Sequence, residues 1–189
     1  MTRFFLKMKH WQFFILTIGL PIIWEFVFID LIATSGKMNP MITPLFFVTT
    51  VLFMVMLIGW MYSIGVRFNR LLPEGVTMKT GFYKFTVIFP VVYVTLFILG
   101  ISVLFGGSAS GNEPNPAMFA LIVPLHFFAM FCMFYMLYFT SKTLKTVEVQ
   151  KKIEFGDYAG EFFLMWFFPI GIWFLQPRIN KIFEEKLEN

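Results

Sequence analysis

The sequence contains four long apolar runs, which limit the chain to a small set of architectures. Each run is near or above the roughly twenty residues that a helix needs to cross a bilayer. The runs cover about residues 11–33, 44–66, 86–106 and 117–140. Only 14% of the residues are charged and 58% are hydrophobic, which departs from soluble domains in the direction of membrane proteins. We therefore predict an all-α integral membrane protein with four transmembrane helices, in which residues 1–189 form a single membrane domain.

The distribution of Lys and Arg predicts how these helices are oriented. Basic residues precede the first run, lie between the second and third, and follow the fourth, whereas only Lys37 lies in a connection on the other side. Cytoplasmic loops of membrane proteins are enriched in Lys and Arg. The pattern therefore predicts that the amino terminus, the connector 67–85 and everything after residue 140 are cytoplasmic. Together with the Phe-rich helices, it favours a bacterial inner (cytoplasmic) membrane with both termini inside.

The apolar segment 160–177 is too short to be a fifth helix of the same kind. Fewer than the roughly twenty residues of a span separate Glu161 from Arg178. Pro169 and Gly171 interrupt its centre, and basic residues flank it on both sides. We interpret the segment as a re-entrant or interfacial helical hairpin that dips into the membrane. A true fifth crossing is the alternative, and it would export the basic residues of the carboxyl-terminal tail.

Segment 141–155 mixes aliphatic and charged residues directly after the fourth run. We interpret it as an amphipathic helix on the cytoplasmic membrane surface. Gly156 is placed to end this helix, and Asp157 to cap the next one. Asp157 and Glu161 then mark the start of the terminal hairpin. They could be coordinating or gating carboxylates at the mouth of a pore, but the helix macrodipole, which favours carboxylates at a helix start, is the preferred explanation.

Three ionisable residues fall within the predicted spans, where a charge costs roughly 2.5 to 3.5 kcal/mol on insertion scales. They are Glu25, Asp30 and His126. A rise of about 1.5 Å per residue puts Glu25 and His126 at a similar depth in the outer half of the membrane, near Thr49 and Thr50. These residues predict either a ligand or ion site, for example in a proton relay, or a polar contact that fastens two helices. The second interpretation is favoured, and Asp30 is close enough to the outer surface to reach water.

A weak internal repeat is also visible. Pro-Leu-x-Phe occurs at residues 44–47 and again at 124–127, and Phe-Pro occurs at residues 89–90 and 168–169. These echoes suggest a two-helix unit used twice in the same orientation, followed by a truncated third copy of its first helix. Matches of this length also arise by chance in a chain so rich in Phe and Leu, so the possible duplication stays open.

The sequence lacks the motifs of enzymes, and we predict no catalytic activity and no cofactor. It has no HExxH, no GxSxG, no phosphate-cradling glycine loop and no D-x-x-D cluster. A single cysteine, Cys132, and two histidines far apart in sequence suggest no metal or haem site. No basic stripe interleaved with aromatic residues favours nucleic acid as a partner.

We expect the partners to be the lipid bilayer and other membrane protein subunits, or further copies of the same chain. The connector 67–85 and residues 141–158 offer ordered charged surface on the cytoplasmic side, and we predict that partners bind there. The leading interpretation is an accessory, scaffold or assembly component without catalytic activity of its own. The alternative is an oligomeric transporter or channel that uses an intramembrane Glu25/His126 site, since re-entrant helices and repeats occur in transporters.

Overall fold

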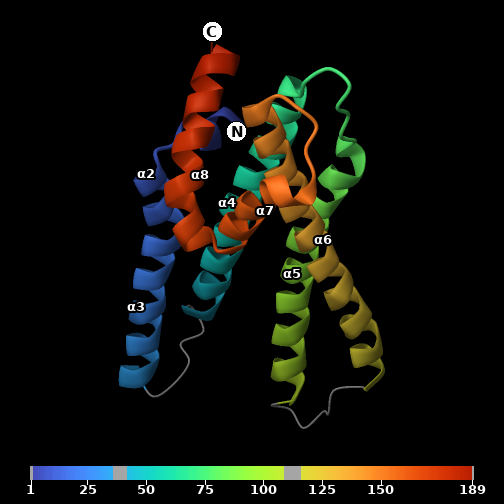
Figure 1. The fold of residues 1–189 in the computed structure, drawn as a ribbon. Helices are drawn as coiled ribbons and strands as arrows, with labels where there is room; N and C mark the ends of the chain where they lie inside the picture. Colours follow the sequence, from blue (N-terminus) through green and yellow to red (C-terminus); the bar gives the residue numbers. More distant parts are fainter. Residues whose placement is uncertain (1, 36–41, 109–115, 189) are drawn as a thin grey trace. The chain divides into compact units, whose positions relative to one another are not determined.

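The computed structural model describes residues 2–35, 42–108 and 116–188, and within these ranges it contains helices and no strand (Figure 1). The α-helices are α1 (Thr2–Lys7), α2 (His10–Phe14), α3 (Leu20–Ser35), α4 (Ile42–Arg67), α5 (Thr80–Ser108), α6 (Pro116–Val149), α7 (Phe155–Trp166) and α8 (Phe168–Phe183). Short π-helices cover Ile15–Gly19 and Glu184–Glu188, and a 3-10 helix covers Phe68–Leu71. The all-α prediction is confirmed.

The helices form two compact units. Unit 1 consists of Met1–Thr80 and Leu137–Asn189, and unit 2 consists of Gly81–Met136. Helix α6 belongs to both, because its first part lies in unit 2 and its last turns lie in unit 1. Unit 1 is therefore assembled from both ends of the chain.

Among the residues that the structure describes, four stretches are long and apolar enough to cross a membrane, which agrees with the four apolar helices predicted. They are His10–Leu31, Val48–Leu71, Thr80–Gly100 and Ala120–Val149. Large apolar side chains on these stretches are exposed, for example Phe26 at 70% and Phe127 at 68%. Many exposed large apolar side chains are unfavourable in water and suit a lipid environment. The helices therefore indicate a membrane location.

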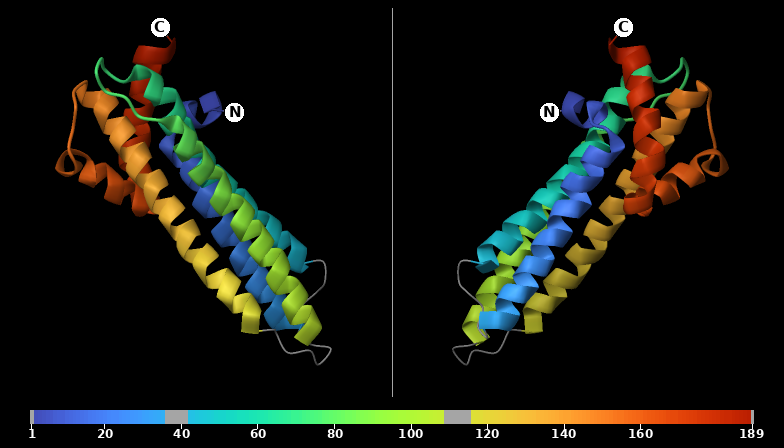
Figure 2. Two further views of the ribbon diagram at one scale, coloured as in Figure 1. Left: turned by 90° about the vertical axis from the view of Figure 1, so that its right-hand side faces the viewer. Right: turned by 90° about the vertical axis from the view of Figure 1, so that its left-hand side faces the viewer.

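The aromatic core of unit 1 lies where α2, α4 and α8 meet. The rings of Phe13, Trp60 and Phe168 are buried, and each pair has a centroid separation of 5.7 Å. Tilted and edge-to-face ring pairs add to the free energy gained from burial. Figure 2 shows α8 beside the amino-terminal helices, and Leu6 of α1 and Ile179 of α8 are fully buried. This core holds the carboxyl-terminal helix on the amino-terminal segment.

The terminal apolar segment is two helices rather than one. Phe167, which separates α7 from α8, has a non-helical backbone with φ −85° and ψ 55°. Gly171 is required beside this turn, because a Cβ atom there would lie 1.7 Å from the Leu164 carbonyl oxygen. Pro169 lies in the first turn of α8, where its missing N–H costs no helical hydrogen bond. The predicted interruption of this segment is therefore present, but the helix breaks at Phe167, two residues before Pro169.

The boundary between α6 and α7 differs from its prediction. α6 ends at Val149, several residues earlier than predicted, because Gln150 adopts a left-handed backbone with φ 51°. The Gln150 side-chain amide donates to the Val147 carbonyl oxygen at 2.7 Å and satisfies an acceptor at the helix end. Gly156, which we predicted to end this helix, instead lies in the first turn of α7. Residues 141–149 do continue the fourth span without a break, as the sequence predicted.

A turn follows α4 and the short 3-10 helix after it. Gly75 has φ 80°, a left-handed conformation that glycine adopts without strain. The Val76 N–H donates to the Pro73 carbonyl oxygen at 3.2 Å across the turn. Asn69 Nδ2 donates to the Met78 carbonyl oxygen at 3.1 Å and ties the two ends of the loop together.

Unit 2 is held by aromatic contacts between α5 and the first part of α6. Phe85, Phe89 and Tyr93 follow one another at intervals of four residues on α5, which places them on one face of the helix. Phe128 of α6 packs against Phe85 and Phe89, and its ring centroid lies 4.8 Å from that of Phe89 in an edge-to-face arrangement. The same face brings the Tyr93 hydroxyl within 3.2 Å of His126 Nδ1.

Candidate functional site

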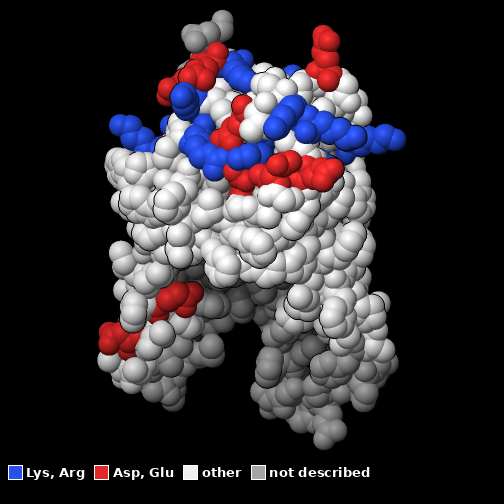
Figure 3. All heavy atoms as spheres, viewed as in Figure 1, with Lys and Arg blue, Asp and Glu red and all other residues white. Residues whose placement is uncertain are grey.

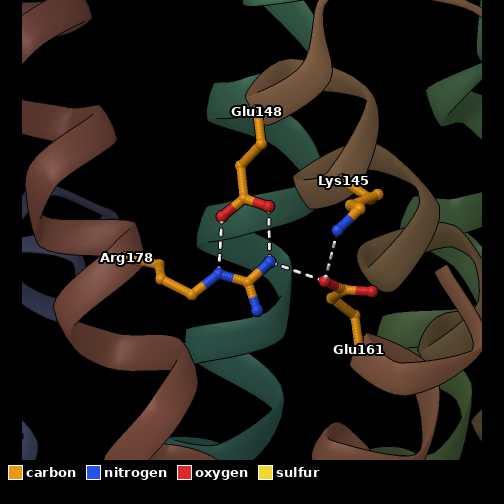
Figure 4. A network of polar contacts seen from close by, with 4 residues as sticks. All are labelled: Lys145, Glu148, Glu161 and Arg178. Atoms are coloured by element: carbon orange, nitrogen blue, oxygen red, sulfur yellow. Dashed lines mark hydrogen bonds and ion pairs between the residues drawn. The ribbon is translucent and has the colours of Figure 1, made fainter. Parts of the chain in front are cut away.

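Four charged side chains from three helices converge in unit 1 (Figure 4). Lys145 and Glu148 come from the last turns of α6, Glu161 from α7 and Arg178 from α8. Lys145 and Glu148 are three residues apart, so they lie on the same face of α6. We call these four residues the Arg178 cluster.

Arg178 lies at the centre of the cluster. Its Nε donates to Oε1 of Glu148 at 2.6 Å, and its Nη2 donates to the other Glu148 oxygen, which makes a bidentate pair. Nη2 also donates to Glu161 Oε1 at 2.5 Å, and Lys145 Nζ donates to the same oxygen at 3.2 Å. Each carboxylate is therefore paired with a cation, and each cation joins different helices.

Burial distinguishes the Arg178 cluster from an ordinary surface ion pair. The side chain of Glu161 is 7% exposed and that of Glu148 is 19% exposed. Burial alone would raise the pKa of Glu161, but hydrogen bonds from Arg178, from its own backbone and from Lys145 outweigh this effect and hold the pKa below its usual value. Hydrogen bonds to Glu148 raise the pKa of Arg178 despite its partial burial. Both carboxylates of the cluster are therefore paired with cations that belong to the cluster.

The two carboxylates predicted at the start of the terminal hairpin have different surroundings. Glu161 belongs to the Arg178 cluster, which the sequence did not indicate. Asp157 lies in the first turn of α7, where its Oδ2 accepts a hydrogen bond from the Glu154 N–H at 2.9 Å. Glu154 is the N-cap and Asp157 is the third helical residue, so the two form a capping box and Asp157 is not the cap itself. The helix-start interpretation fits Asp157, whereas Glu161 joins helices.

The intramembrane residues of the predicted ligand or ion site are distributed over both units. Glu25 is half-buried on α3, and Thr49 and Thr50 are half-buried on α4, all in unit 1. His126 is exposed on the part of α6 in unit 2, where its Nδ1 pairs with the Tyr93 hydroxyl. The structure therefore gives His126 a tyrosine partner, and its pairing with Glu25 stays a prediction.

A second polar group, which the sequence analysis missed, holds the amino-terminal segment on α8. The side chain of Gln176 is fully buried, and its Oε1 accepts a hydrogen bond from Trp60 Nε1 at 2.7 Å. Its Nε2 donates to the carbonyl oxygens of Phe5 at 2.9 Å and Met8 at 2.7 Å. Asn180, one turn later, donates to two carbonyl groups of the same segment. The side-chain amide nitrogens of Gln176 and Asn180 thus donate four hydrogen bonds to carbonyl groups of this segment.

These contacts satisfy backbone groups that α1 cannot satisfy by itself. The last carbonyl groups of a helix have no partner within it. The usual donor to the Phe5 carbonyl would be the N–H of Lys9, but this N–H donates to Gln12 Oε1 at 3.0 Å. One sequence signal could have indicated this role. Gln176 and Asn180 are four residues apart, so they lie on one face of α8.

The described residues contain no group of three or more His, Cys, Asp or Glu side chains that could hold a metal ion. Within the same ranges, two buried side-chain polar atoms lack a hydrogen-bond partner, Trp24 Nε1 and Thr146 Oγ1. No family model, curated protein or solved structure matches this chain. The chemistry of the Arg178 cluster and of Gln176 is that of contacts that join helices.

Proposed function

We propose that the protein is a membrane component without catalytic activity of its own, which acts as an accessory, scaffold or assembly subunit. The observation that carries this proposal is the Arg178 cluster, in which four charged side chains, buried or partly buried, bind one another and join α6, α7 and α8. An enzyme site needs reactive groups that converge on a pocket open to substrate, whereas these groups face each other. A surface held in one arrangement loses less entropy when it binds a partner.

The proposed docking surface lies at the charged end of unit 1. Its exposed charged residues come from the connector after α4 and from the α6–α7 boundary, and they are Arg70, Glu74, Lys79, Lys151, Lys152, Glu154 and Asp157. Figure 3 shows Lys and Arg gathered at the end of unit 1 that carries the termini, which supports a cytoplasmic position for this end. We propose the bacterial inner membrane as the location, as the sequence favoured. The mixture of signs suits another protein subunit with a complementary pattern.

The same proposal treats α7 and α8 as a hairpin that dips into the membrane. Side chains around its turn are apolar and exposed, among them Phe167 at 59% and Ile170 at 61%. The turn lies on the apolar side of the band of charge, and α8 runs back toward the termini (Figures 1 and 3). Aromatic rings are favoured at the level where headgroups meet hydrocarbon. These features support a re-entrant or interfacial hairpin over a fifth crossing.

Association with a larger complex tests the proposed function. The protein is isolated from its native membrane in mild detergent, and the mass of the particle is measured by native mass spectrometry. We expect a heteromeric complex that the charge reversal Lys152→Glu dissociates while the melting temperature of the isolated chain is unchanged. The matched control is Lys181→Glu, which makes the same change of charge on an exposed side chain of α8. A particle that holds this chain alone, or equal loss of the complex in both variants, refutes the proposal.

Ion transport by an oligomer is the second candidate function, and one observation favours it. Glu25 lies within the candidate span His10–Leu31, beside Trp24, whose buried Nε1 has no hydrogen-bond partner among the described residues. Ionisable residues within spans often mark ion pathways. This function requires a symmetric homo-oligomer whose ion flux in proteoliposomes is abolished by Glu25→Gln and retained by Asp30→Asn, an exposed carboxylate on the same helix. Equal flux in the wild type and both variants refutes it.

A further inference from the structure

A groove lies on the amino-terminal segment, where the charged start of the chain meets the first span. It has a volume of about 340 Å³ and is lined by Phe4, Met8, Trp11, Gln12, Ile15 and Leu16. This volume is at the lower end of the range of small-molecule sites, which is roughly 300–1,000 Å³. Gln12 is the only polar lining residue, and its Oε1 already accepts a hydrogen bond from the Lys9 N–H. The walls of the groove are therefore apolar in character.

The groove is formed by a bend in the backbone that the rest of unit 1 holds in place. The chain leaves α1 and enters α2 at Met8 and Lys9, so side chains from both helices meet there. The amide of Gln176 fixes the bend through the carbonyl groups of Phe5 and Met8. A site that exists before its ligand arrives binds with less loss of entropy.

Cations flank the groove, and carboxylates are absent from this part of the sequence. Arg3 and Lys9 are neighbours of lining residues in the chain, and both are exposed. The hydrogen bond from the Lys9 N–H to Gln12 keeps Lys9 beside the groove. The first acidic residue of the sequence is Glu25, more than two helical turns beyond the last lining residue. Apolar walls and positive side chains therefore meet where the first candidate span, His10–Leu31, begins.

We propose that this groove binds one anionic phospholipid of the surrounding leaflet. An acyl chain lies against the apolar wall that includes Ile15 and Leu16, and the lipid phosphate is bound by Arg3 and Lys9. Both parts of the lipid contribute, because burial of the chain removes apolar surface from water and the two cations attract the negative headgroup. A zwitterionic lipid carries a cationic group that opposes the two side chains. The charge complementarity of the site therefore favours the anionic lipid.

Native mass spectrometry of the full chain tests the proposal, with equal amounts of phosphatidylglycerol and phosphatidylcholine as the probe. We expect the wild type to retain one phosphatidylglycerol. Each cation near a membrane surface is worth roughly a fivefold change in affinity, so Arg3→Ser/Lys9→Ser is expected to weaken binding about thirtyfold. The matched control, Lys151→Ser/Lys152→Ser, removes the same charge from exposed positions elsewhere in unit 1 and is expected to leave binding unchanged.

A second variant tests the apolar wall without changing the charge. Leu16→Trp fills the groove and is expected to release the phosphatidylglycerol although both cations remain. Circular dichroism and the melting temperature show whether each variant is folded, and the two serine variants decide the question if Leu16→Trp does not fold. Equal weakening by both serine pairs would mean that the lipid responds only to overall charge, and the site would be refuted. Displacement of the lipid by millimolar glycerol phosphate would also overturn the proposal, because it would show that the acyl chain is not needed.

Discussion

The substitution Gln176→Leu is expected to detach the amino-terminal segment from α8. Leu has nearly the shape of Gln but removes three hydrogen bonds of 2.7–2.9 Å, one to Trp60 and two to backbone carbonyl groups. The Met8 carbonyl keeps a bond from Asn180 at 3.2 Å. Trp60 Nε1 and the Phe5 carbonyl lose the bonds that Gln176 supplies in the buried core.

The expected loss follows from these groups. A buried polar group without a partner costs about 1–3 kcal/mol, so two such groups give roughly 2–6 kcal/mol. Hydrogen bonds between helices in lipid average only about 0.6 kcal/mol, which sets a lower figure of roughly 2 kcal/mol for three bonds. The Leu side chain recovers about 1 kcal/mol by burying more apolar surface. We therefore expect the free energy of unfolding to fall by about 1–5 kcal/mol.

Two measurements on the purified protein in detergent check this expectation. Thermal unfolding reports the global loss, and limited trypsin digestion reports release of the segment through faster cleavage after Lys7 and Lys9. The matched control is Gln150→Leu, which makes the same substitution at an exposed side chain whose amide donates to the end of α6. If both variants lower stability equally, or if Gln176→Leu leaves the trypsin sites as protected as in the wild type, the assigned role of Gln176 is wrong.

Three further predictions concern the turn, the ion cluster and unit 2. Gly171→Ala is expected to lower the free energy of unfolding by more than about 3 kcal/mol, because its methyl group would overlap a backbone carbonyl. The control Gly160→Ala has open space around the new methyl group. It is expected to be neutral or slightly stabilising in the same thermal assay. The pKa of Glu161 is lower in the folded protein than its usual value of 4.5, so the stability it supplies is present above about pH 4.5 and is lost as the pH falls through the lowered value. Glu161→Gln is therefore expected to flatten the acid limb of a plot of melting temperature against pH, and an unchanged limb contradicts the assignment. A double-mutant cycle of Tyr93→Phe and His126→Leu is expected to give a coupling of about 0.6–1.7 kcal/mol, and a coupling of zero would show that their contact contributes nothing.

The features that the sequence predicted correctly are those encoded by neighbouring residues. Four runs of apolar residues predict four helices because the thickness of a bilayer sets the length of a span. Pro169 and Gly171 predict a break because proline and glycine disturb a helix locally, and α7 ends at Trp166, shortly before them. The end of α6 was misplaced because Gln150, not Gly156, takes the left-handed conformation, which glycine usually takes at a helix end. The two-helix duplication stays a prediction, since short sequence matches do not by themselves establish a common structure.

The polar contacts that hold unit 1 together could not be predicted from local patterns. Arg178 pairs with Glu148, 30 residues earlier, and Gln176 binds the Phe5 carbonyl, 171 residues earlier. Which polar groups meet depends on how the helices pack, and spacing within one helix carries no information about partners so distant in sequence.

The alternation of polar residues on α8 explains how one helix joins both ends of the chain. Residues two apart on an α-helix point in nearly opposite directions, and residues four apart share a face. Gln176 and Asn180 therefore face the amino-terminal segment while Arg178 faces α6 and α7, as their hydrogen bonds require. Because α8 follows every candidate span in the chain, these contacts form only after all four spans have been synthesised. Unit 1 can therefore be completed only after α8 has been synthesised. The proposed docking surface depends on α8 for the same reason, because contacts between residues far apart in the sequence form late.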